Sequence, residues 1–203
     1  MDNTSGCDSA YPSPGRRLRR LVVLTCLALA PAACLPVYEV SPANDTAEFF
    51  LSTTNDSTAT TLRTAYVWVF KDEECTRSEL GMRAGNAMNN DSEATTAPQK
   101  VLANEKFVFT ASYGDARFAQ NRRCAVTAGF VPRKNRRYKA QLVVTDDVRG
   151  CSLGIYDVTS SKDQQIEFSM PQHLCVDSGK STSLNGRPLW TDWHIQAHVV
   201  SRR

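Results

Sequence analysis

Long apolar runs are missing from this 203-residue chain. The run near its start, Leu21–Ala30, would cover about 15 Å as a helix, half of the ~30 Å hydrocarbon core of a bilayer. A transmembrane helix is therefore excluded for this segment. Histidine is also scarce, with His173, His194 and His198 alone, and no Cys-x2-Cys pair is present. Both gaps argue against a zinc-type site, and we expect no metal and no cofactor.

A basic segment precedes the apolar run, and small residues follow it. Residues 16–20 contain four arginines, and Ala32-Ala33-Cys34 comes after the run. This order is typical of an export signal. Residues 30–32 fit ordinary signal peptidase, whereas residues 31–34 resemble the bacterial lipobox, in which the cysteine becomes lipidated, although Pro31 departs from that pattern. We favour lipidation of Cys34 over simple secretion, and hence a membrane contact through lipid.

A strong excess of positive charge is absent once this signal is set aside. Of the 24 basic and 21 acidic residues, four and two respectively precede Cys34, so the mature chain carries 20 and 19. Nucleic-acid binding needs a marked basic footprint, and we therefore expect no nucleic-acid partner. The roughly 170 remaining residues suit one domain with its own core.

The cysteines that follow Cys34 are Cys75, Cys124, Cys151 and Cys175. An even number in an exported chain predicts two disulfides, and metal ligation is the less favoured alternative. Of the three pairings we prefer Cys75–Cys124 with Cys151–Cys175. In a meander, Cys124 and Cys151 would lie on strands flanking a third, about 10 Å apart and beyond the ~7 Å Cα limit for a bridge.

Alternating apolar and polar side chains dominate the chain after residue 45, and residues 65–70 are continuously apolar. The expected inward rows are Ala47, Phe49, Leu51; Phe107, Phe109; Cys124, Val126, Ala128, Phe130; Tyr138, Ala140, Leu142, Val144; Cys151, Leu153, Ile155; Ile166, Phe168, Met170; and Trp193, Ile195, Ala197, Val199. About eight strands and no convincing helix follow. We expect an all-β fold, a two-sheet antiparallel sandwich of immunoglobulin-like or transthyretin-like type, because each half-polar sheet must bury its other face.

The expected organisation is an export signal over residues 1–34, a tether over 35–44 and one β-sandwich domain over 45–203. Two long connections interrupt the strand pattern. Residues 76–104 form a polar stretch, for which we expect one long loop with a helical turn near 78–88. Residues 176–188 are rich in serine and glycine. Loops of this length are often functional.

One stretch carries a resemblance, residues 124–158 with the sequence CAVTAGFVPRKNRRYKAQLVVTDDVRGCSLGIYDV. A strand ending in Phe-x-Pro is followed by a basic turn, an Arg-x-Tyr-like strand and a cysteine-bearing strand ending in Asp. Together with the signal, this pattern resembles uncharacterised proteobacterial envelope lipoproteins. The resemblance implies an envelope location and a disulfide-bearing β-sandwich, and it transfers no site.

The most concentrated charges lie at Arg122-Arg123 and in a basic cluster, which we define as Arg133, Lys134, Arg136 and Arg137. If residues 124–130 and 138–144 form a hairpin, the basic cluster caps its tip. We favour a solvated turn whose charges discourage edge pairing, and contact of the tip with anionic lipid or another envelope protein is the alternative.

Two motifs fail as sites. His194 and His198 alternate with apolar residues, so a strand would hold them about 13 Å apart, too far to share one ion. Gly179-Lys180-Ser181-Thr182 lacks the glycine that a phosphate-binding loop needs, because Leu174 stands in its place.

We therefore expect an exported, non-catalytic, lipid-anchored protein of the cell envelope, at the outer membrane or in the periplasm, that serves binding or assembly. The alternative is a small secreted hydrolase or inhibitor that acts through the 76–104 or the 176–188 loop.

Overall fold

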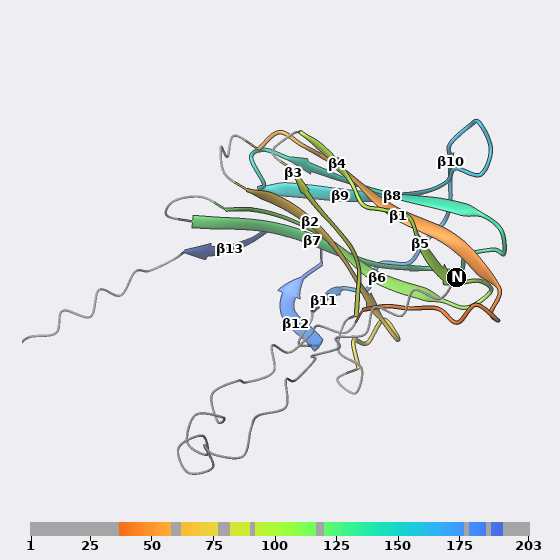
Figure 1. Cartoon of the computed structure of the whole chain (residues 1–203). Coiled ribbons are helices and arrows are strands. Elements are labelled where there is room, and N and C mark those ends of the chain that lie inside the picture. Colours follow the sequence, from red (N-terminus) through yellow and green to blue (C-terminus); the bar gives the residue numbers. More distant parts are fainter. Residues whose placement is uncertain are drawn as a thin grey trace, which may run out of the picture. The chain divides into compact units, whose positions relative to one another are not determined.

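The alternating residues form strands along almost all of the described chain (Figure 1). The computed structural model describes residues 37–57, 62–76, 82–89, 92–116, 120–176, 179–185 and 188–192. Every regular element in these ranges is a strand, which confirms the all-β prediction. The strands are β1 Thr46–Asn55, β2 Arg63–Phe70, β3 Met82–Asn89, β4 Glu93–Thr95, β5 Gln99–Leu102, β6 Phe107–Ala116, β7 Gln120–Phe130, β8 Arg137–Thr145, β9 Gly150–Asp157, β10 Gln164–Gln165, β11 His173–Val176, β12 Gly179–Leu184 and β13 Pro188–Asp192. A search of these ranges for a helix able to cross a membrane finds none.

The first sheet has the order β10-β9-β8-β1-β4, and β5 also pairs with β1. Strand β1 runs parallel to β8, with Glu48 opposite Arg137 and Asn55 opposite Val144. The prediction of a purely antiparallel sandwich is wrong at this pair. Parallel neighbours need a crossover connection, and here strands of the other sheet lie between β1 and β8 in the sequence.

The second sheet has the order β13-β7-β6-β2-β3 and is antiparallel throughout. Strands β11 and β12 form a separate two-stranded ribbon. The connection from β7 to β8 passes from the second sheet to the first, so the hairpin predicted for residues 124–144 is wrong. The basic cluster lies on or beside this connection between sheets.

The two sheets bury their facing sides in one shared core. The Phe49 ring of β1 lies 4.7 Å from the Phe109 ring of β6, and Phe130 of β7 lies 5.0 Å from Tyr138 of β8. The inward rows predicted on β1, β6, β7 and β8 are all buried. Apolar burial of this kind is the main favourable term in folding, so these rows hold the sheets together.

The remaining predicted rows fare differently. On β9, Ile155 is buried and Cys151 and Leu153 are partly buried. Residues 166–170 do not form a strand, because β10 ends at Gln165; Ile166 and Phe168 nevertheless pack against the core, partly buried, while Met170 is 59% exposed. The row from Trp193 to Val199, with His194 and His198 between its members, lies outside the described residues.

The long loop predicted for residues 76–104 is largely wrong. It contains β3, β4 and β5, and Met82–Asn89 is a strand where a helical turn was expected. Strand β3 continues the second sheet, while β4 and β5 both pair with β1. The polar residues of the 76–104 stretch suit strands at the edge of a sheet, where one face meets water. Similarly, much of the 176–188 connection is β12.

Two disulfides form, but not in the predicted pairing. Cys75 is bonded to Cys175, and Cys124 is bonded to Cys151. The predicted pairing was wrong because it placed Cys124 and Cys151 in one sheet. Strand β7 belongs to the second sheet and β9 to the first, and their two cysteines meet between the sheets with Cα atoms 6.2 Å apart.

The chain enters the sheets at one end, which we call the entry end. It holds the starts of β1, β6 and β8 and the end of β7, and the opposite end is called the far end. Within the predicted tether, Tyr38 already packs on the domain. Its N–H donates to the Arg83 carbonyl at 3.1 Å, and its ring lies 6.0 Å from that of Phe107. Burial raises the pKa of the Tyr38 hydroxyl.

Candidate functional site

A groove of about 460 Å³ lies on the outer face of the second sheet, toward the far end. We call it the outer groove. Six residues from three adjacent strands define it: Thr64, Tyr66 and Trp68 of β2, Ser112 and Gly114 of β6, and Arg123 of β7. Its volume falls in the range of pockets that hold small molecules.

Strand alternation explains why these residues share one face. Their neighbours Ala65, Val67 and Cys124 are buried in the core, so the groove residues point the other way. Thr64, Gly114 and Arg123 lie side by side in the sheet register. Because Gly114 has no side chain, the floor between its two neighbours stays low.

Arg123 is the cation of the outer groove. Its Nε–H donates to the Ser112 hydroxyl at 2.9 Å, and Ser112 itself is 1% exposed. No carboxylate forms an ion pair with Arg123 among the side chains that the structure describes. The guanidinium therefore has a fixed position and donors left for a ligand.

The neighbouring Arg122 has a different role. Its Nη1 pairs with the Asp147 carboxylate and also donates to the Asp147 carbonyl at 2.8 Å. The Asp56 carboxylate accepts the backbone N–H groups of Asp146 and Asp147 at 2.8 and 3.0 Å. Arg122 thus fixes the β8–β9 turn, and its charge is paired with the Asp147 carboxylate.

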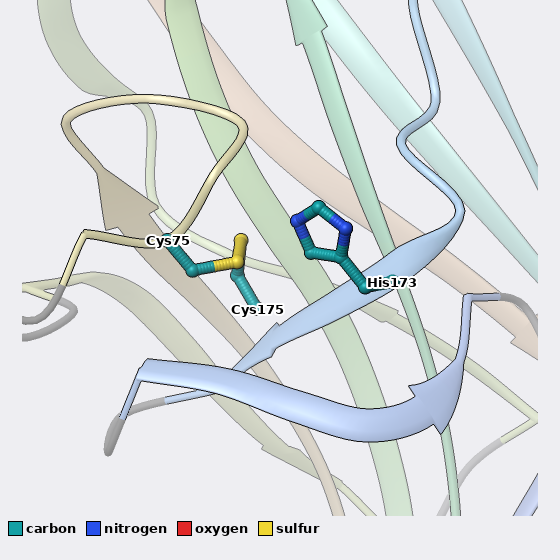
Figure 2. A group of neighbouring side chains, drawn as sticks. All are labelled: Cys75, His173 and Cys175. Atoms are coloured by element: carbon teal, nitrogen blue, oxygen red, sulfur yellow. A yellow bond between two sulfur atoms is a disulfide. The ribbon is translucent and has the colours of Figure 1, made fainter.

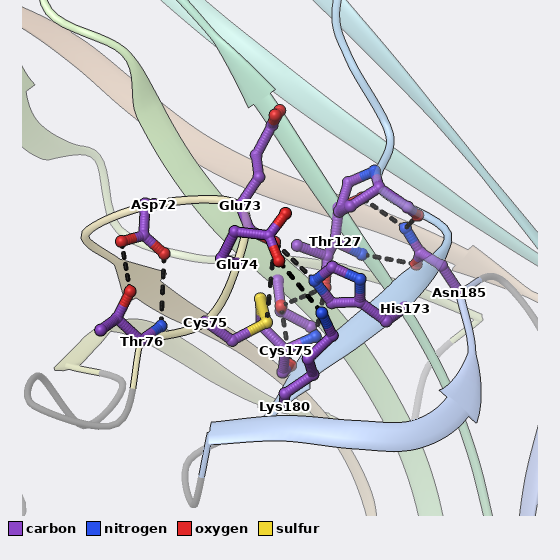
Figure 3. The surroundings of a disulfide bond; sticks show 12 residues. Asp72, Glu73, Glu74, Cys75, Thr76, Thr127, His173, Cys175, Lys180 and Asn185 are labelled. Atoms are coloured by element: carbon purple, nitrogen blue, oxygen red, sulfur yellow. Dashed lines mark hydrogen bonds and ion pairs between the residues drawn. A yellow bond between two sulfur atoms is a disulfide. The ribbon is translucent and has the colours of Figure 1, made fainter.

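The ribbon β11–β12 covers the part of the outer face next to the groove. Trp68 packs there with Phe70, Val108 and the Cys75–Cys175 disulfide in a second apolar cluster. Beneath it, the Thr110 hydroxyl donates to the Cys175 carbonyl at 3.0 Å, and the Cys175 N–H donates to the Thr127 hydroxyl at 2.9 Å. Figure 3 shows Cys175 and Thr127 next to each other at the disulfide.

His173 lies beside the same disulfide (Figure 2). A ring nitrogen of His173 and the sulfurs of Cys75 and Cys175 all lie within 4.8 Å of one another, the spacing of a metal site. Metal binding by cysteine needs thiolates, however, and here the sulfurs are bonded to each other. The Nε2 of His173 bonds instead to the Glu73 carbonyl at 2.6 Å. This hydrogen bond indicates a structural role for His173.

The turn that carries Cys75 is fixed by charge as well as by the disulfide. The Glu73 carboxylate pairs with Lys106 at 2.9 Å and accepts the Ser169 hydroxyl. The bonds from Lys106 and then Ser169 hold the pKa of Glu73 below its usual value. A side chain at position 129 would place its Cβ 2.7 Å from the same carboxylate, so the Glu73 side chain would have to shift if Gly129 were replaced.

A strand, a side-chain amide and a backbone segment cover successive parts of the outer edge of β7. Strand β13 pairs with residues 120–124. Next, the Asn185 amide imitates a strand partner, since it accepts the Thr127 N–H at 2.8 Å and donates to the Thr127 carbonyl at 2.7 Å. Finally, Ser169 exchanges backbone hydrogen bonds of 2.9 and 2.8 Å with Gly129. A covered edge cannot recruit another strand.

The basic cluster lies at the entry end, and its members are exposed. Three of the four face a carboxylate: Lys134 pairs with Asp45 at 2.7 Å, Arg136 with Asp157 at 3.7 Å and Arg137 with Glu48 at 3.5 Å. The Arg137 guanidinium also lies 5.1 Å from the Phe50 ring centroid. These contacts leave less charge for an anionic surface than the sequence suggested.

Cys34 lies outside the described residues, as do His194 and His198. Residues 179–182 belong to β12, which pairs with β11 and has no helix after it in the described chain.

Sequence reasoning missed the outer groove, although it noted the charge of Arg122-Arg123. The signal that could have found it is the row Thr64, Tyr66, Trp68, which alternates with the buried Ala65 and Val67. Which strands lie beside that row could not be read from alternation.

Comparisons with protein-family models, with curated proteins and with solved structures give no match. The findings thus describe an all-β chain with two disulfides, for which no family is identified. Disulfides persist in oxidising compartments, and they indicate an extracytoplasmic location.

Proposed function

We propose that this chain is a non-catalytic, lipid-anchored protein of the cell envelope that serves binding or assembly. One observation supports a lipid anchor at Cys34. Cys75 pairs with Cys175 and Cys124 with Cys151, so all four cysteines after Cys34 are used among themselves. Within the predicted mature chain no cysteine is left to pair with Cys34, which follows small residues at the end of an export signal.

The export signal and the resemblance of residues 124–158 support an envelope location at the outer membrane or in the periplasm. The outer groove supports the binding part of the proposal. Tyr66 and Trp68 line it, and among the side chains that the structure describes no carboxylate pairs with its cation, Arg123. The assignment of the sandwich to an immunoglobulin-like or transthyretin-like type stays a prediction.

The point of chain entry fits an anchor at Cys34. The described chain begins at Val37, three residues later, and Tyr38 is already packed at the entry end. Three residue steps span at most about 11 Å. A lipid on Cys34 would therefore hold the entry end, together with the basic cluster, close to the bilayer.

Fractionation of cells that express the full chain tests the anchor. We expect the wild-type protein in the membrane fraction and Cys34→Ser in the soluble fraction, because a serine cannot accept the lipid. Cys7→Ser is the matched control and should stay with the membrane. A Cys34→Ser protein that remains membrane-bound would contradict the proposal.

A further inference from the structure

We infer that the outer groove binds a small organic carboxylate with a flat apolar body, and that Arg123 holds the carboxylate. This inference rests on the binding part of the proposed function and is independent of the lipid anchor. The inference starts from the surroundings of the Arg123 guanidinium. Arg123 is partly buried, its guanidinium is oriented by Ser112, and no described side chain supplies it with a carboxylate.

A partly desolvated cation favours an anionic partner, because loss of water is otherwise uncompensated. Guanidinium presents a planar fork of donors that matches the two oxygens of a carboxylate. Since Nε is used by Ser112 at 2.9 Å, the terminal Nη donors are the ones left to the ligand. The bond to Ser112 fixes the plane of the fork before the ligand arrives.

The rest of the groove sets the body of the ligand. Tyr66 and Trp68 stand in a row on β2, across β6 from the strand of Arg123. Both residues line the groove, with Tyr66 partly buried and Trp68 9% exposed, and Gly114 leaves the floor low between Thr64 and Arg123. A flat ring suits such an aromatic lining better than a flexible chain, because less freedom is lost on binding.

Other charges near the groove do not compete for the ligand. Arg122 is engaged by Asp147. Asp115 also borders the groove, but it is 2% exposed and accepts the Ser57 hydroxyl at 2.6 Å. The carboxylate site therefore centres on Arg123.

Binding of benzoate to the purified full-length protein tests the inference, followed by NMR signals of tryptophan indoles and arginine Nε groups. We expect benzoate to bind more tightly than acetate, which lacks the ring, and than benzamide, which lacks the charge. Arg123→Gln should weaken benzoate binding by about 10- to 100-fold, the range expected for a charge-assisted hydrogen bond. Arg123→Lys keeps the charge without the fork, and its affinity for benzoate should fall between those of the wild type and Arg123→Gln.

Two further variants keep the test decisive if Arg123→Gln folds poorly. A Cβ at Gly114 would meet its nearest atoms at 3.6 Å, an ordinary contact, so Gly114→Ala fits the strand and raises the floor of the groove while Arg123 remains. It should weaken benzoate binding. Arg149→Gln, in an exposed turn, is the matched control and should bind benzoate normally.

Equal binding of benzamide and benzoate, or benzoate binding that is unchanged in both Arg123→Gln and Gly114→Ala, would overturn the inference. So would an absence of benzoate shifts up to the solubility limit in the wild-type protein. Cys34→Ser should bind benzoate as the wild type does. Failure of the anchor and failure of the carboxylate site are thus separable.

Discussion

At the scale of single residues, Asn185 replaces a whole strand partner. Its side-chain amide bonds to both backbone groups of Thr127 and also donates to the Pro171 carbonyl at 2.9 Å. An unpaired polar group in a covered position costs more than the bond itself contributes. The β7 edge next to the ribbon therefore depends on one side chain.

We predict that Asn185→Ala lowers the free energy of unfolding by about 2 kcal/mol, because two backbone groups of Thr127 lose their partner. Urea unfolding measures the change. Asn86→Ala removes an exposed asparagine from β3 and should stay within about ±0.5 kcal/mol. An Asn185→Ala protein as stable as the wild type would show that this amide does not hold the edge.

Glu73 makes a second residue-scale prediction, on pH. Its pKa is lowered by its bonds from Lys106 and Ser169, so its contribution is complete above the unfolded value of about 4.3 and is lost as pH falls through the folded value. Glu73→Gln should destabilise the protein at pH 7, and the difference from wild type should shrink as the solution is acidified below pH 4. Urea unfolding at several pH values measures this, with the exposed Glu167→Gln as control. A difference that is independent of pH would contradict the role of the carboxylate.

At the scale of elements, the two disulfides close loops of different length. Cys75 and Cys175 are 100 residues apart, and Cys124 and Cys151 are 27 apart. Loop entropy predicts that removal of the first pair by double alanine substitution costs about 4.7 kcal/mol and removal of the second about 3.5 kcal/mol. Urea unfolding ranks them, and non-reducing peptide mapping checks the connectivity. Mapping that finds Cys75–Cys124 would contradict the sheet assignment itself.

The same scale shows how far the sequence predicts this fold. Alternation identified the buried faces of β1, β6, β7 and β8, because side-chain direction has a period of two residues. It did not identify the partner of each strand. Nothing in residues 48–55 indicates a parallel contact with residues 137–144, which depends on the path of the chain through the second sheet.

The errors in site prediction have the same cause. The sequence-based prediction placed β7 and β8 in one hairpin. In that arrangement Cys124 could not reach Cys151, and the basic cluster would lie at the exposed tip of the hairpin. Once β7 and β8 lie in different sheets, the disulfide is short and the cluster meets carboxylates from β1 and β9. The outer groove needs three adjacent strands, and only their pairing brings Arg123 level with Thr64, on the face that also carries Tyr66.

At the scale of the whole domain, chain entry and the outer groove lie toward opposite ends of the sheets. Strand β6 has 10 residues, which corresponds to about 33 Å between its ends. If Cys34 carries lipid, the entry end faces the bilayer and the groove is presented away from it.

A pair of reporters tests this orientation. Ser161 follows β9 at the entry end, and Ser92 precedes β4 at the far end, both exposed. In vesicles that carry the lipidated protein, a dye on Ser161→Cys should be quenched by lipid-bound quencher, and the same dye on Ser92→Cys should not. Equal quenching at both positions would contradict the orientation.

Mass spectrometry of the mature N-terminus decides whether Cys34 carries a lipid. We predict a first residue of Cys34 with the added mass of a lipid, and Cys75–Cys175 and Cys124–Cys151 intact in the same protein. A mature chain that begins at an unmodified Ala33 would contradict this prediction.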